Sequence, residues 1–359
     1  MHMQQDSTVQ PPQSGARRVA WVDIARVYAA IIIIANHLNL FSPDLYRTLW
    51  AQFLFARTPF FLILAAYFVG RGAFGTFRLN QLFLIKRARF LFYPYLLWCT
   101  AALVLTGTSP HTPHVETFAP FFAWLHGGSL PWTDAFKALA KCYGLGGHPV
   151  DAPLWFLRDI ILFTFIAPLL MRLGKYVLPV GLVLLSFNFF AQGDLGHDWP
   201  TPDSLGFFCL GLFLSRYSLD ELHAIIRPVA AFFAAVLIPL TVWLILNRDQ
   251  HSIILVMIGL VSLISVAMLT EDHFPRIGKW LAQLAPAGFL VFGAHHIIII
   301  LLQDSGWISC KGWLWDVTWL VLVPAIYAII CAVFFLIRKY APALLPYVAG
   351  YRVKPAQRA

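Results

Sequence analysis

Long apolar stretches alternate with short polar segments along almost the whole chain. The hydrocarbon core of a bilayer is about 30 Å thick, so a helix that crosses it needs roughly 20 predominantly apolar residues. The pattern therefore predicts an all-α, polytopic integral membrane protein, with about ten transmembrane helices in one bundle. The predicted spans are 19–41, 50–70, 88–107, 154–172, 176–192, 203–217, 228–247, 252–270, 285–303 and 315–338.

The composition supports this class. Of the 359 residues, 59% are hydrophobic and 12% are charged, whereas soluble domains carry about 25% charged residues. The apolar content excludes a disordered or collagen-like chain. The net charge of +9 does not indicate a nucleic-acid-binding protein, because membrane proteins gather Lys and Arg on one side of the bilayer.

The basic residues follow the alternation of the loops. Eighteen of the 26 Lys and Arg residues lie in segments on one side of the predicted membrane, and five lie on the other side. Cytoplasmic loops carry the excess of positive charge. Both termini are thus expected in the cytoplasm, with the protein in a bacterial inner or plasma membrane.

The chain divides into a polar tail (1–18), a membrane domain (19–340) and a second cytoplasmic tail (341–359). A long external loop (108–153) interrupts the membrane domain, and its segment 132–143 is typical of a short amphipathic helix at the interface. The histidines of this loop lack the spacing of metal ligands, so no metal is expected. Pairing of Cys142 with Cys310 across two external loops stays open.

Ionisable residues inside a span are the strongest functional signal, because hydrocarbon makes them costly. The first predicted span carries Asp23, Arg26 and His37. Arg26 and His37 are eleven residues apart, so they share a helix face and lie about 16 Å apart along the axis. A substrate that spans this depth would meet both side chains. Arg26 is expected to pair with Asp23 in either case. The alternative is that this pair lies near the interface without a role in a site, and that His37 reaches outward to the interface.

The spacing of Arg26 and His37 resembles the membrane-bound acyltransferase 3 family, and five other segments agree in order. Trp21-Val-Asp23-Ile-Ala-Arg26 resembles the family's opening. The apolar stretch 60–68, the basic stretch 86–89 before Tyr93-Pro94-Tyr95, Leu154-Trp155-Phe156-Leu157, and His295-His296 resemble its later motifs. Together they cover about residues 19–338. Two segments depart from the family pattern: Ala65-Ala66 replaces a Ser-Gly pair, and Lys86 stands where an Arg often begins an RxxR pattern.

The resemblance implies transfer of an acyl group, usually acetyl from acetyl-CoA, to a hydroxyl of a carbohydrate or glycolipid. His37 is the candidate general base, or alternatively a covalent acyl carrier. Arg26 would steer the donor or stabilise the oxyanion. The cations expected to bind acyl-CoA phosphates are Lys86, Arg87, Arg89 and Arg57, and the residues expected to contact the acceptor are Trp155, Arg158, His295 and Tyr67.

These expected acceptor residues could instead serve only to stabilise the fold. Arg158 would pair with Asp159 or Asp151, and Trp155 and Tyr67 would pack in the core. Because adjacent helical residues diverge by about 100°, only one of His295 and His296 is expected to face the site.

Two other function classes compete with acyl transfer. Intramembrane Arg and His also mark transport pathways, so a glycolipid or polysaccharide transporter or flippase is the main alternative. No inverted repeat or matched pair of broken helices supports it. A non-catalytic membrane scaffold is the third possibility, although both tails are short.

Overall fold

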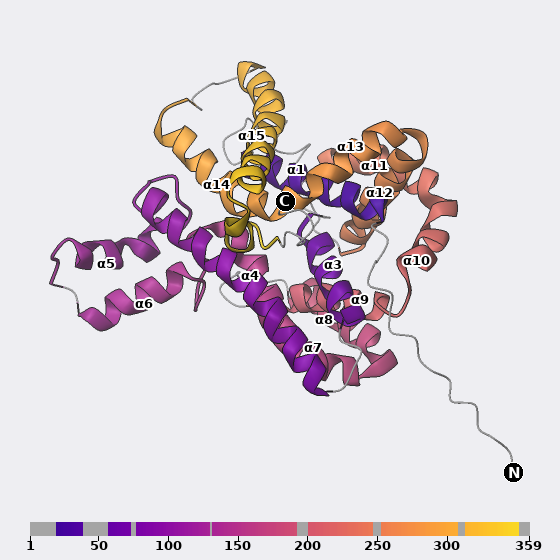
Figure 1. The fold of residues 1–359 in the computed structure, drawn as a ribbon, viewed down its shortest axis with the longest axis horizontal. Helices are drawn as coiled ribbons and strands as arrows, with labels where there is room; N and C mark the ends of the chain where they lie inside the picture. The colour runs from indigo at the N-terminus through magenta and orange to yellow at the C-terminus, as the bar shows by residue number, and fades with distance from the viewer. Residues whose placement is uncertain are drawn as a thin grey trace, which may run out of the picture.

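The computed structural model describes residues 19–38, 57–72, 77–129, 131–191, 200–246, 253–307 and 313–351. In these ranges all regular structure is helical (Figure 1). The α-helices are α1 (Ala20–Leu38), α3 (Arg57–Gly72), α4 (Phe77–Thr106), α5 (Val115–Leu125), α6 (Trp132–Cys142), α7 (Trp155–Arg172), α8 (Val177–Ala191), α9 (Pro202–Leu214), α10 (Leu219–Ile226), α11 (Ala230–Leu246), α12 (Ile253–His273), α13 (Pro275–Leu284), α14 (Gly288–Asp304), α15 (Trp313–Tyr340) and α16 (Leu345–Val348). A short 3-10 turn, η3 (Ala152–Leu154), leads directly into α7.

The prediction of an all-α membrane protein is confirmed. Each of the ten predicted spans overlaps a helix in the part of the chain that the structure describes. Six described segments are long and apolar enough to cross a bilayer: Ala20–Leu38, Gln81–Thr106, Ala152–Arg172, Ile254–His273, Pro275–Asp304 and Leu320–Tyr340. Because α3, α8 and α9 are shorter apolar helices, the count of ten remains a prediction.

The basic segment before the third span differs from the prediction, because it is helical rather than a loop. Helix α4 begins at Phe77 and continues through Pro94 to Thr106. Leu84 and Ala88, four residues apart, are buried, while Lys86 and Arg89 are exposed. This is the pattern of an amphipathic helix. The apolar side chains between the charged residues pack against the fold, so α4 begins at Phe77, before the predicted span at residue 88.

The long loop between α4 and α7 folds into a helical hairpin that projects from the bundle (Figure 1). Helix α6 confirms the predicted amphipathic helix, since Ala135, Ala138 and Cys142 are buried along one face. Helix α5 was not predicted. The Cys142 thiol donates to the Ala138 carbonyl at 3.2 Å, whereas Cys310 lies outside the described residues.

Helix α1 occupies the centre of the fold and contacts α3, α12, α13, α14 and α15. It is apolar on nearly all sides, as expected of a helix that is buried all round. Its small residues Ala25, Ala29 and Ala30 are buried and let neighbouring helices approach closely. A residue on α1 can therefore meet side chains from several parts of the chain.

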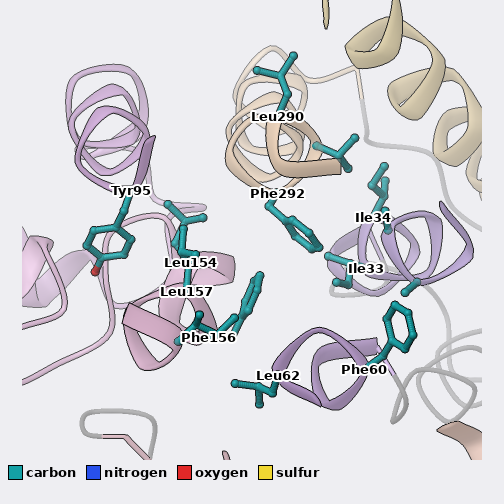
Figure 2. Packing of buried hydrophobic residues seen from close by; sticks show 14 of the residues in the cluster. Ile33, Ile34, Phe60, Leu62, Tyr95, Leu154, Phe156, Leu157, Leu290 and Phe292 are labelled. Carbon is teal, nitrogen blue, oxygen red and sulfur yellow. The ribbon is translucent and has the colours of Figure 1, made fainter. Parts of the chain in front are cut away.

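The core beside α1 is built largely from aromatic and branched side chains. Figure 2 shows Phe156 of α7 and Phe292 of α14 pointing toward one another, with Ile33 of α1 nearby. The rings of Phe156 and Phe292 lie 5.0 Å apart at 67°, and Phe61 of α3 meets Phe292 edge to face at 4.6 Å. This geometry is favourable for aromatic pairs, and it joins α3, α7 and α14 next to His37.

Candidate active site

Three histidine rings meet near the end of α1. The ring of His37 lies 5.1 Å from that of His295 and 5.2 Å from that of His296, both on α14. The expectation that only one of the two adjacent histidines would face this site is wrong. The rings of His295 and His296 are 6.4 Å apart, and each of them contacts the His37 ring.

A pocket of about 100 Å³ opens beside His37. Its lining comes from α1, α3, η3 and α7, and consists of Ile33, Asn36, His37, Thr58, Pro153, Trp155 and Phe156. The structure thus places Trp155, an expected acceptor contact, in the same pocket as the candidate base. The polar groups of Asn36 and Thr58 border the histidine, and apolar side chains line the remainder.

His295 is held in one tautomer by the backbone of its own helix. Its Nδ1 lies 2.7 Å from the Val291 carbonyl oxygen, which can only accept a hydrogen bond. The Nδ1–H therefore donates, and Nε2 carries the lone pair. Nε2 is buried and has no hydrogen-bond partner among the described residues, so its lone pair lies inside the histidine cluster without a donor from these residues.

His296 faces a carboxylate. Its Nδ1 lies 3.5 Å from Asp151 Oδ1, and the two side chains are 3% and 0% exposed. Asp151 immediately precedes η3, just outside the span that contains α7. Burial raises the pKa of Asp151 well above its ordinary value, because the charged carboxylate is poorly solvated there.

Arg26 lies on the same helix as His37 but at a different depth. Its Nη1 donates to Asp23 Oδ1 at 3.2 Å, which confirms the predicted pairing. The Arg26 side chain is 34% exposed, whereas that of Asp23 is 7% exposed. Eleven residues of α-helix separate Arg26 from His37, which corresponds to about 16 Å. The two side chains therefore cannot contact the same atom.

Two of the expected acceptor residues make internal contacts away from the pocket. The Arg158 guanidinium bonds to Asp159 and to the carbonyls of Gly144 and Gly147, each at 3.0 Å. Its partner is thus Asp159, not Asp151, and it fixes the end of the hairpin onto α7. The Tyr67 hydroxyl donates to the Tyr217 carbonyl at 3.0 Å. The structure brings neither side chain to the pocket.

The expected donor cations do not form one group. Lys86 and Arg89 are exposed on α4, three residues apart and therefore on one face. Arg87 instead donates to the Ala65 carbonyl of α3 at 3.0 Å. Arg57 is the first residue of α3, and its side chain lies outside the described residues.

The residue that sequence reasoning missed is Asp151, which it considered only as a partner for Arg158. The available signal was an acidic residue one position before an apolar span, next to Pro153 and Trp155. Within the described ranges, no group of three or more His, Cys, Asp or Glu side chains is arranged to hold a metal ion.

The fold and this site define an integral membrane protein with an ionisable cluster buried among its helices. Comparison with known proteins identifies the family: the one described as an acyltransferase domain matches residues 19–339. The chain therefore belongs to the acyltransferase 3 family, as its motifs indicated.

A curated relative is the succinoglycan biosynthesis protein ExoH of Rhizobium meliloti (strain 1021). It is 26% identical over 290 residues, which cover 74% of this chain and 71% of the relative. No solved structure matches this chain.

Proposed function

We propose that this membrane acyltransferase moves an acetyl group from cytoplasmic acetyl-CoA to a hydroxyl group of a carbohydrate, an exopolysaccharide or lipid-linked oligosaccharide precursor. Membership of the acyltransferase family supports the reaction class. The succinoglycan biosynthesis relative supports a polysaccharide acceptor. The observation that carries the proposal is that His37 borders a pocket beside Trp155 and contacts two further buried histidines.

In this proposal a neutral His37 acts as the general base. The acceptor hydroxyl oxygen attacks the thioester carbonyl carbon while the His37 imidazole takes the hydroxyl proton. The carbon–sulfur bond then breaks, and the CoA thiolate leaves. The proton passes from His37 to this thiolate, so the products are an ester and CoA with its thiol restored. Trp155 would stack on the sugar ring, because its indole borders the same pocket.

The donor would enter from the side that carries the excess of basic residues. Lys86 and Arg89 are exposed on α4 and suit the phosphates of CoA. Arg26 lies about 16 Å from His37 along α1, which suits a contact with the extended pantetheine arm. This assignment requires both termini to be cytoplasmic, in agreement with the charge distribution of the loops.

The test uses membranes that contain wild-type protein, His37→Ala or His37→Gln, matched for the amount of folded protein. Acetyl-CoA labelled in the acetyl group is added with polar lipids and glycans from the host. Label should enter the glycolipid or polysaccharide fraction together with release of CoA, and both His37 variants should abolish it. His126→Ala is the matched control, because His126 is exposed at the end of α5.

The other outcomes are equally informative. Absence of both label and CoA release with wild-type protein would reject acetyl-CoA as the donor and favour the transporter alternative. Transfer that survives in both His37 variants would retain the enzyme and reject His37 as its base.

A further inference from the structure

Asp151 is a buried carboxyl group two residues before Pro153, which lines the pocket. Its side chain is completely buried, and neither carboxylate oxygen has a hydrogen bond among the described residues. The other buried carboxylate of this region, Asp159, accepts a 3.0 Å hydrogen bond from Arg158. A buried carboxylate costs several kcal/mol unless it is paired, so the weak pairing of Asp151 in the resting protein requires a reason.

The structure gives Asp151 an ionisable partner in the histidine cluster. His296 Nδ1 lies 3.5 Å from Asp151 Oδ1, and the His296 ring is 5.2 Å from the His37 ring. His296 therefore lies between the carboxyl group and the candidate base. His295 contacts His37 at a similar distance, but its Nδ1 bonds to the Val291 carbonyl. A carbonyl oxygen is not ionisable, so His295 has no carboxyl partner of the kind that His296 has.

We propose that Asp151 is a positioning residue for acyl transfer: through His296, it stabilises the positive charge that forms on His37 when the base takes the acceptor proton. This inference rests on the proposed function. The proton moves only between the acceptor hydroxyl, His37 and the departing CoA thiolate. Asp151 holds the His296 imidazole in position, and this oriented imidazole acts on the charge of His37 in surroundings of low dielectric, where such an interaction is strong.

A purely structural role for Asp151 predicts different behaviour. Asp151 would then matter because it precedes η3 and sets the start of α7, and its loss would lower the amount of folded protein. Turnover by the protein that did fold would be unchanged. The two roles therefore separate when kcat, KM and stability are measured on the same folded samples.

The experiment compares Asp151→Asn, His296→Gln, the double variant and wild type in detergent or membranes, with the labelled acetyl-CoA assay. Asp151→Asn should lower kcat on the order of tenfold to a hundredfold, the usual effect of removing a partner that orients a functional histidine. The KM for acetyl-CoA should change less than about twofold, since a group that acts on the transition state leaves ground-state binding intact. The double variant should be no slower than His296→Gln alone, because Asp151 acts through His296.

The matched control is Asp159→Asn, which removes a carboxylate of equal burial that is paired with an arginine. It should lower thermal stability and leave the kcat of the folded fraction unchanged. A wild-type kcat in Asp151→Asn, or multiplying losses in the double variant, would overturn the inference while leaving acyl transfer in place. If Asp151→Asn does not fold, an unchanged kcat in His296→Gln overturns it equally. If wild-type protein transfers no label, it is the proposed function that fails.

Discussion

The Arg87 guanidinium on α4 donates a 3.0 Å hydrogen bond to the Ala65 carbonyl on α3. Ala65 is one of the two alanines that replace the family's Ser-Gly pair. One of the cations expected to bind acyl-CoA thus joins two helices in this protein. Lys86 and Arg89, by contrast, are exposed on α4. Residues adjacent in the sequence therefore have separable roles.

Arg87→Ala should destabilise the protein by about 1–3 kcal/mol, because it leaves the Ala65 carbonyl without its side-chain partner and removes a packed stem. Thermal unfolding in detergent measures this change. Lys86→Ala is the control and should shift the unfolding free energy by less than about 0.5 kcal/mol, as expected of an exposed position. Equal stability of the two variants would show that the bond between α3 and α4 contributes nothing.

Lys86 and Arg89 should act on donor binding. Replacing both with Ala should raise the KM for acetyl-CoA about tenfold with little change in kcat, since two exposed cations that attract phosphates each contribute up to about 1 kcal/mol. The effect should shrink at high salt, where exposed charges are screened. A kcat loss without a KM change would place the donor phosphates elsewhere.

Ionisable residues within an apolar run can be identified from the sequence, because burying them in hydrocarbon is energetically costly. His37 and Arg26 stand out because each is ionisable within an apolar run, and Trp155 lies in a recognisable motif. The convergence of His295 and His296 on His37 could not be predicted, because it depends on how α14 crosses α1. Asp151 escaped notice because it lies at the end of a loop, where an acidic residue costs nothing unless the fold buries it.

The helices, too, divide into those that the sequence predicts and those that it does not. Helices α1, α7, α14 and α15 follow from apolar runs of sufficient length. The amphipathic helices α5, α10 and α13 lie where loops were expected. Each is eleven residues or shorter, and at this length isolated helices are marginal without tertiary packing. The local pattern did predict α6, which is also eleven residues long, but it left these three helices among the loops.

Trp155 should determine acceptor binding. Trp155→Leu should raise the KM for the carbohydrate acceptor about twofold to tenfold, since an aromatic contact contributes roughly 0.5–1.5 kcal/mol beyond its buried area. The KM for acetyl-CoA should be unchanged. Trp124→Leu makes the same exchange on α5, where Trp124 is 42% exposed, and should leave both constants at wild-type values. An unaltered acceptor KM in Trp155→Leu would assign this indole to packing alone.

Two glycines on α14 give the sharpest test of how the histidine cluster is held. A Cβ added at Gly293 would overlap the indole ring of Trp98 on α4. That ring cannot move freely, because its Nε1–H donates to the Val348 carbonyl at 2.9 Å. A Cβ at Gly288, by contrast, would meet nothing within 4 Å, and Gly288 already has helical φ and ψ angles of −52° and −38°.

Gly293→Ala should therefore destabilise the protein by about 1–3 kcal/mol or more, the usual cost of overpacking a filled interior. Gly288→Ala should stabilise it by about 0.4–1 kcal/mol, because alanine restricts the unfolded chain. His295 and His296 lie two and three residues after Gly293 on α14. Displacement of that helix from α4 should therefore also lower the kcat of folded Gly293→Ala, whereas Gly288→Ala keeps full turnover. Thermal unfolding and the labelled-acetyl assay on the same samples separate the two effects. Wild-type kcat in a destabilised Gly293→Ala would mean that the cluster tolerates movement of α14, and that His37 alone determines the rate.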